Sequence, residues 1–331
     1  MNTFKLAVVQ AAPVVLDRAA ALEKAAAYIA RAAREGAKLV VFPEAYVPTY
    51  PFWVWFLAPR EHARLAELHA RLVEQSVSLP GPELAPVQEA ARAAGVFVAL
   101  GVNERNAEAS GTSLFNTVVL MGPDGEIVAK HRKLVPTGPE RLVWAQGDGS
   151  TLSPVSTPLG RFGMLICWEN YMPLARYALY AQGMDVLLSP TYDEGETALC
   201  SVRHIAKEGR VYVASASLVL HVDHVPKAHG LAGLVAGRDW IKNGDSAVAA
   251  PSGELIAGPL PREEGILYAD IDPVAITGSR WNLDVAGHYA RPDVFHFGLR
   301  RRMLTPMSIE EEAEQETVVR RPSQNAVQIL D

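Results

Sequence analysis

The stretch Gly36-Ala-Lys-Leu-Val-Val-Phe-Pro-Glu44 decides the fold class, because a helix-ending glycine leads into an apolar strand that stops at a proline. Upstream, residues 6–10 form another short apolar run, and Asp17 is placed to cap an alanine-rich helix that continues to Arg34. Strand, helix and strand in this order form a βαβ unit, which indicates a sheet covered by helices. The sequence is therefore predicted to be of the α/β class.

The same order of elements recurs in the second half of the chain. A predicted helix over residues 174–182 is followed by Gly183 and by an apolar strand over residues 185–189 that stops at Pro190. Between the two halves, Gly122-Pro-Asp-Gly125 has the composition of a tight turn and predicts a β-hairpin. The other expected elements are helices over residues 83–94 and 194–208, strands over 96–102, 115–121, 126–130, 161–167 and 211–217, and a hairpin around Pro251-Ser-Gly253.

The composition of the 331 residues is that of a globular protein. Hydrophobic residues make up 49% of the chain and charged residues 21%, so a large core can be buried. The formal net charge of -6 argues against nucleic acid, whose phosphates attract clustered Lys and Arg. Because no linker-like stretch precedes residue 300, we expect one domain over residues 1–300. The charged residues 301–331 are typical of an extension that is mobile or depends on assembly.

Targeting segments and metal motifs are not apparent in the sequence. No apolar run reaches eighteen residues without a charge, and residues 1–13 resemble a strand rather than a signal, so we expect a cytoplasmic protein without membrane contact. The cysteines, Cys167 and Cys200, are too few for a disulfide framework. Nine histidines occur without the spacing of zinc ligands. We therefore expect no metal and no cofactor.

Cys167 ends the apolar strand Phe162-Gly-Met-Leu-Ile-Cys167, and a predicted helix begins a few residues later. Open α/β sheets bind ligands beyond the carboxyl ends of their strands, so this thiol is a candidate nucleophile. A buried structural cysteine would show the same pattern, and this feature alone leaves both interpretations open. Cys200 instead falls in a helical pattern that predicts a packed face and an inert thiol, among Ala198, Leu199, Val202 and Ile205.

Three charged residues beyond strand ends could act with this thiol. Glu44 follows an apolar strand and is a candidate base for the thiol proton, although such a glutamate can also be a helix cap or a solvated charge. Lys133 follows the hairpin, where most lysines are surface charges. Its ammonium would stabilise the negative charge that develops when a nitrile or amide carbon is attacked. Glu140, seven residues later, could orient Lys133.

Together these residues resemble the nitrilase superfamily, whose Glu-Lys-Cys triad follows this chain order. The resemblance is closest to the nitrilase branch and runs from Lys5 to about Phe297. It is carried by Phe42-Pro-Glu44, His131-Arg-Lys-Leu-Val-Pro-Thr-Gly-Pro-Glu-Arg141, Trp144, Gly147-Asp-Gly-Ser150, Gly160-Arg161, Cys167-Trp-Glu-Asn170, Met172-Pro-Leu-Ala-Arg176 and Gly287-His-Tyr-Ala-Arg-Pro-Asp-Val-Phe295. One departure is Asn243-Gly-Asp-Ser246, where nitrilases usually have two glycines before the serine, so the resemblance does not fix the geometry of that loop.

The resemblance implies a single-domain αββα sandwich and a cysteine hydrolase. It assigns the triad to Glu44, Lys133 and Cys167, with Glu140 as the additional carboxylate that holds the lysine. It also implies a homodimer and often larger spiral assemblies. The implied reaction converts an organic nitrile to a carboxylic acid and ammonia through a thioimidate and a thioester on the cysteine, with some amide as a minor product.

Other activities of the same triad remain open at this point. An amidase or N-carbamoyl hydrolase would use the same side chains, but Trp168-Glu169 after the nucleophile resembles nitrilases. Cyanide hydrolases commonly have His where this chain has Asn170. A catalytically silent binding protein of the same fold is disfavoured by the intact catalytic positions, and a doubly wound cofactor enzyme by the lack of a GxGxxG motif after an early strand.

Aromatic residues near Glu44 are candidates for the substrate pocket. Trp53, Trp55 and Phe56 follow Tyr50-Pro-Phe52, and such a cluster walls a pocket about as often as it forms core or dimer interface. We assign the pocket to Tyr50, Trp53, Trp168 and Tyr192. Aromatic or arylaliphatic nitriles are the expected substrates.

Overall fold

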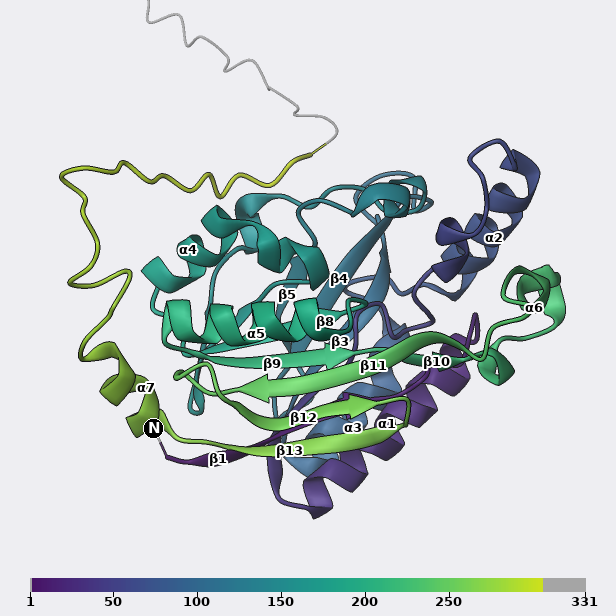
Figure 1. The fold of residues 1–331 in the computed structure, drawn as a ribbon. Helices are drawn as coiled ribbons and strands as arrows, with labels where there is room; N and C mark the ends of the chain where they lie inside the picture. The colour runs from purple at the N-terminus through teal and green to yellow at the C-terminus, as the bar shows by residue number, and fades with distance from the viewer. Residues whose placement is uncertain (1, 306–331) are drawn as a thin grey trace, which may run out of the picture.

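A computed structural model describes residues 2–305, which form two β-sheets packed face to face (Figure 1). The first sheet has the strand order β13 (Gly265–Ile271), β1 (Phe4–Gln10), β2 (Ala37–Val41), β3 (Phe97–Arg105), β4 (Leu114–Met121) and β5 (Ile127–Arg132). The second has the order β10 (Val219–His221), β11 (Trp240–Ala249), β9 (Tyr212–Ser217), β8 (Val186–Thr191), β7 (Gly160–Met164) and β6 (Val155–Thr157), with β12 (Leu255–Pro261) paired to β11.

Both sheets mix parallel and antiparallel pairs, as the sequence predicts. β1, β2 and β3 are parallel, as are β7, β8 and β9. The hairpins, β4 with β5 and β11 with β12, are antiparallel. The predicted turn closes the first hairpin, because Gly122 N donates to Glu126 O at 2.8 Å.

Helices cover the outer face of each sheet. α1 (Arg18–Arg34) and α3 (Ala85–Ala94) pack on the first sheet, and α4 (Pro173–Ala181) and α5 (Glu196–Gly209) on the second. The remaining helices are α2 (His62–Gln75), α6 (Leu231–Leu234) and α7 (Pro273–Arg280). Short 3-10 turns occupy Phe52–Trp55, Pro82–Leu84, Gly138–Leu142, Gly149–Thr151, Cys167–Tyr171, Val222–His224 and Ala228–Gly230.

Three apolar cores join these layers. One fills the space between the two sheets and includes Leu6 and Leu39 from the first sheet and Phe162 and Leu188 from the second. The others lie between each sheet and its helices. Because the layers succeed one another as helix, sheet, sheet and helix, the predicted single-domain αββα sandwich is confirmed.

Several local predictions are also confirmed, and one boundary is wrong. The Asp17 side chain caps α1 by accepting from Ala20 N, and α3 ends at the predicted Ala94. Gly95 follows at a φ of 62°, in the left-handed region that glycine favours. Pro190 does not stop its strand but lies inside β8. Leu188 O accepts from Leu165 N, so the backbone polar groups of Leu188 face β7. These groups point to alternate sides along a strand, so the nitrogen of Pro190, two residues later, also faces this side, where β7 has already ended. Its missing N–H therefore costs no ladder bond.

The last described residues cross the outside of the second sheet's helices. Phe297 contacts Tyr177 of α4 edge to face, with ring centroids 5.2 Å apart, and Leu304 N donates to Asp148. Most of the predicted extension, residues 306–331, lies outside the described residues. Among residues 2–305 no helix is long and apolar enough to span a membrane.

Candidate active site

The ends of strands from both sheets bring the predicted site residues together. Lys133 follows β5, and its Nζ donates to Glu44 Oε1 at 2.9 Å and to Glu140 Oε2 at 2.8 Å. Glu44 follows β2 by way of Phe42 and Pro43. All three side chains are almost completely removed from solvent. The lysine thus lies between two carboxylates, which makes its burial as a cation tolerable.

Glu44 has one oxygen engaged and one oxygen without a partner among the described residues. Oε1 accepts from Lys133 and from Asn116 Nδ2, the latter at 2.6 Å, whereas Oε2 is buried with no hydrogen bond. The segment reaches this place by passing close to β3, because a Cβ on Gly101 would lie 2.1 Å from Pro43 O. Asn116 was missed from the sequence, and its one signal is a polar residue inside the apolar strand β4.

Glu140 is oriented by contacts from two directions. It lies in the 3-10 turn Gly138–Leu142, where Thr137 N donates to Oε2 at 2.7 Å. Its other oxygen accepts from the hydroxyl of Tyr50 at 2.6 Å, and that hydroxyl in turn accepts from Trp55 Nε1 at 3.0 Å. The sequence predicts that Glu140 orients Lys133, and the structure places the two in direct contact.

Cys167 occupies the turn that follows β7. Its φ is 54°, in the left-handed region that non-glycine residues rarely adopt. The residue is 8% exposed and lines a cavity. Asn170 stabilises the turn by donating to the carbonyl oxygens of Leu165 and Cys167 and to Ser189 Oγ.

Burial and charge shift the pKa values of the grouped side chains. Burial raises the pKa of Glu44 above its usual value, although Lys133 acts in the opposite direction. Burial and the negative charge of Glu44 raise the pKa of the Cys167 thiol to about 12, again against the effect of Lys133. For Lys133, burial lowers the pKa, but the negative charges of Glu44 and Glu140 outweigh it and keep the pKa above its usual value. These shifts favour a charged Lys133 and a neutral Cys167 thiol.

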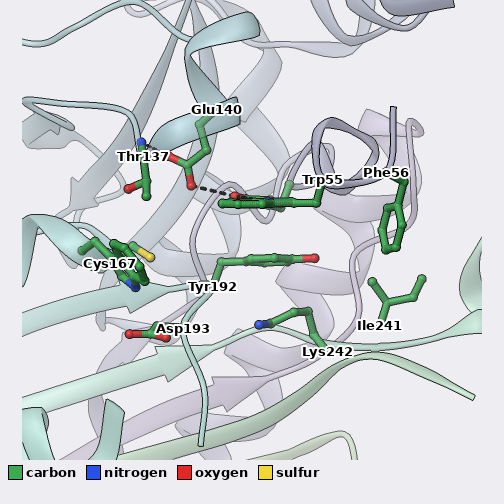
Figure 2. Close-up of a pocket in the computed structure, with 11 residues that line it drawn as sticks. Trp55, Phe56, Thr137, Glu140, Cys167, Tyr192, Asp193, Ile241 and Lys242 are labelled. Atoms are coloured by element: carbon green, nitrogen blue, oxygen red, sulfur yellow. Dashed lines mark hydrogen bonds between the residues drawn. The ribbon is translucent and has the colours of Figure 1, made fainter. Parts of the chain in front are cut away.

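A cavity of about 270 Å³ lies in front of Cys167 (Figure 2). Figure 2 shows Cys167 and Glu140 at one end and Phe56 and Ile241 at the other. The lining residues are Tyr50, Trp55, Phe56, Thr137, Glu140, Cys167, Trp168, Tyr192, Asp193, Ile241 and Lys242.

Of the predicted pocket residues, Tyr50, Trp168 and Tyr192 line this cavity and Trp53 does not. Trp53 is fully buried in the core beneath, with its ring edge against Phe52. The assignment of Trp53 to the pocket is therefore wrong. Residues of a 3-10 turn point about 120° apart, so Trp53 faces inward while Trp55 faces the cavity.

Stacked rings form one wall of the cavity. Tyr50 and Tyr192 are parallel, with centroids 3.6 Å apart, and Lys242 Nζ lies 4.3 Å from the centroid of the Tyr192 ring. Lys242 also pairs with Glu194 at 3.2 Å, and Glu194 accepts from Asn243 N. The Asn243-Gly-Asp-Ser246 stretch thus fastens the loop that carries Tyr192.

Two further observations concern cysteine and metal chemistry. Both thiols are free, but Cys200 is exposed on α5, so the prediction that it packs into a helix face is wrong. The buried side of α5 is formed by Val202, Ile205, Ala206 and Gly209.

In residues 2–305 no group of three or more His, Cys, Asp or Glu side chains is arranged to hold a metal ion.

Comparisons with known proteins agree with this fold. The family model for carbon-nitrogen hydrolases matches residues 5–280. The chain is 41% identical to an aliphatic nitrilase of Sinorhizobium fredii, over 89% of this chain and 95% of that protein, and 37% identical to nitrilase 1 of Arabidopsis thaliana, over 96% and 93%. Among solved structures, Saccharomyces cerevisiae Nit3, a member of the nitrilase superfamily, matches with a TM-score of 0.69 at 22% identity, over 87% of this chain and 97% of Nit3.

The fold and these matches define a class of enzyme, the hydrolases that act on carbon–nitrogen bonds other than peptide bonds. The chain belongs to the carbon-nitrogen hydrolase family and, within it, to the nitrilases.

Proposed function

We propose that this nitrilase hydrolyses an organic nitrile to a carboxylic acid and ammonia, with Cys167 as the nucleophile. The observation that carries the proposal is the contact of Lys133 with both Glu44 and Glu140 at the end of the cavity that exposes Cys167. A nucleophilic thiol needs a base, and its attack needs a positive charge nearby. Both are within this cluster.

Glu44 is proposed as the base and acid of the reaction. Its raised pKa favours proton uptake, and its unpartnered Oε2 is free to take a proton. Glu44 takes the thiol proton as sulfur bonds to the nitrile carbon, and the proton passes to nitrogen to give the thioimidate. A water deprotonated by Glu44 adds to this carbon, and the nitrogen leaves as ammonia.

The remaining thioester is hydrolysed by a second water, which releases the acid and restores the thiol. Lys133, held by Glu140, stabilises the negative charge of the tetrahedral centres. If the first tetrahedral adduct expels sulfur instead of nitrogen, the product is the amide. A minor amide product is therefore expected from the same site.

For the substrate, we propose aromatic or arylaliphatic nitriles. This choice is supported by the aromatic rings of Tyr192, Trp55 and Phe56 along the cavity and by apolar Ile241 at the end away from Cys167. The relative in Sinorhizobium fredii is named an aliphatic nitrilase, so the preference has to be measured.

Ammonia and acid release should be measured with benzonitrile, phenylacetonitrile, mandelonitrile, an aliphatic dinitrile and cyanide, each with the matching amide where one exists. We expect turnover of at least one organic nitrile and the highest kcat/KM with an aromatic one. Turnover of amides or carbamoyl compounds alone would overturn the proposed reaction. A clear preference for the dinitrile would overturn only the substrate class.

Two further parts of the proposal concern Glu140 and assembly. Glu140→Gln keeps the size of the side chain but removes the charge that faces Lys133, so a large loss of kcat in a folded protein is expected.

We also propose at least a homodimer, with residues 301–331 as an extension of the 1–300 domain that influences larger assembly. Light scattering of the full-length and tail-deleted proteins tests this, and a fully active monomer at micromolar concentration would contradict the dimer.

A further inference from the structure

One buried carboxylate outside the proposed triad joins the two chain segments that carry Lys133 and Cys167. Glu169 is 2% exposed and lies in the turn after β7. Its Oε1 accepts from Leu134 N at 2.9 Å, and its Oε2 accepts from Ile166 N at 2.8 Å. Leu134 directly follows Lys133, and Ile166 directly precedes Cys167. A single side chain therefore holds the backbone beside both groups.

His131 adds a side-chain contact to the same carboxylate. Its Nε2 lies 3.0 and 2.9 Å from the two oxygens of Glu169, and its Nδ1 lies 3.1 Å from Thr151 Oγ1. His131 is fully buried and stands two residues before Lys133 on β5. Since side chains alternate along a strand, His131 and Lys133 leave β5 on the same face. The contact therefore fixes the strand end that aims Lys133.

The turn that these contacts restrain is strained. Cys167 has a φ of 54°, a conformation that costs free energy for a non-glycine residue and persists only where surrounding contacts enforce it. The hydrogen bond from Ile166 N to the Glu169 side chain closes this turn directly. Without it, the thiol can relax away from the cavity and from Lys133.

We propose that Glu169, supported by His131, is a positioning residue that sets the placement of Cys167 relative to Lys133. The inference rests on the proposed roles of these two residues. Glu169 does not line the cavity. Its loss should therefore lower kcat while KM changes little.

The test compares Glu169→Gln with a matched change of a buried carboxylate on β3, both made in a Cys200→Ala parent so that Cys167 is the remaining thiol. Glutamine has a single accepting oxygen, so it can accept from only one of Leu134 N and Ile166 N. Its NH2 group would face the other N–H, and that backbone segment loses its hydrogen bond. Glu104 is the control, because it is also fully buried and binds Lys130 and Arg132, the residues that alternate with His131 and Lys133. Glu104→Gln weakens a comparable network of ion pairs, on the opposite face of the first sheet.

For Glu169→Gln we expect kcat to fall by roughly 10- to 100-fold with KM within about threefold, because a 1 Å misplacement can cost about 100-fold. The rate at which iodoacetamide alkylates Cys167 should fall several-fold. Glu104→Gln should keep both rates within about twofold even if its melting temperature drops. Circular dichroism confirms that each protein is folded.

A folded Glu169→Gln protein with kcat and alkylation rate within twofold of the parent, or one that changes only KM, would overturn the inference. If Glu169→Gln does not fold, His131→Asn takes its place, since it leaves both backbone bonds of Glu169 and should give a smaller loss of the same kind. The alkylation rate needs no substrate. A parent protein that turns over no nitrile would therefore refute the proposed function, while alkylation still tests the positioning role.

Discussion

The hydroxyl of Tyr50 donates to Glu140 Oε1 at 2.6 Å, although the two residues are 90 positions apart in the sequence. Tyr50→Phe removes this donor but keeps the ring that stacks on Tyr192. Glu140 then has more freedom to turn away from Lys133, and we expect kcat to fall about 10-fold, equivalent to about 1.4 kcal/mol. Steady-state kinetics with the best nitrile provides the measurement.

Tyr28→Phe is the matched control for Tyr50→Phe. The Tyr28 hydroxyl also donates to a carboxylate, that of Glu264, but neither residue lines the cavity. A hydrogen bond to a charged group contributes about 1.5 to 3 kcal/mol, so either variant can lower stability. Only Tyr50→Phe should lower kcat. An equal loss of activity in both variants would show that the Tyr50 effect is general destabilisation.

Asn116 is expected to support the activity of Glu44 through its 2.6 Å hydrogen bond to Oε1. Asn116→Leu preserves the approximate shape and removes this donor, together with an amide oxygen that has no hydrogen-bond partner among the described residues. Because that orphaned oxygen is also lost, stability should change by less than about 1 kcal/mol. We expect kcat to fall about 10-fold. Chemical denaturation and kinetics measured together would expose a loss of stability without a loss of rate, which contradicts this role.

The sequence predicts the α/β class from patterns along the chain, and the resemblance carried by its motifs implies the sandwich and the proposed triad. Glu44 and Cys167 each follow an apolar strand and Lys133 follows a hairpin strand, and α/β folds place their sites beyond the carboxyl ends of strands. Contacts that depend on packing carry no such pattern. Nothing in the sequence shows that Tyr50 reaches Glu140 or that Glu169 joins two strand ends.

The errors in the sequence prediction have a geometric cause. The apolar residues of α5 suggested that Cys200 is packed, but successive helix residues turn by about 100°. Cys200 therefore lies about 200° around the helix from Val202, which is buried, and the thiol faces outward. Trp53 was misplaced for the same reason, since a run of aromatic residues does not show which ring a short turn directs inward.

The exposure of Cys200 reverses the expected order of thiol labelling. Iodoacetamide reacts with thiolates that it can reach. Cys200 is exposed, whereas Cys167 is buried and its pKa is raised to about 12, so Cys200 should be alkylated first and without loss of activity. Inactivation should follow the slower labelling of Cys167. Peptide mass mapping against residual activity checks this order.

Substitutions separate the roles of the two thiols. Cys200→Ala should retain full activity, and Cys167→Ala should fold but release no ammonia, because the covalent step has no other nucleophile. A bound product acid should slow the labelling of Cys167, which lines the cavity, but not that of Cys200. Ammonia release by Cys167→Ala, or inactivation with Cys167 unmodified, contradicts the proposed mechanism.

The raised pKa of Cys167 also predicts how stability depends on pH. A free thiol in the unfolded chain has a pKa of roughly 8.5, whereas burial and Glu44 raise the folded value to about 12. Because the folded pKa is the higher one, folding favours the neutral thiol. This contribution is fully present below roughly pH 8.5 and is lost as the pH rises from there toward 12.

Cys167→Ser has no ionisable thiol, so its free energy of unfolding should fall less than that of the unmodified protein between pH 7.5 and 10. Tyrosines and lysines titrate in both proteins, and the difference between them isolates Cys167. Cys200→Ser, at the exposed position, should follow the unmodified protein throughout. Urea denaturation at pH 7.5, 9 and 10 measures these free energies, and parallel curves for Cys167→Ser and the unmodified protein would contradict a buried neutral thiol.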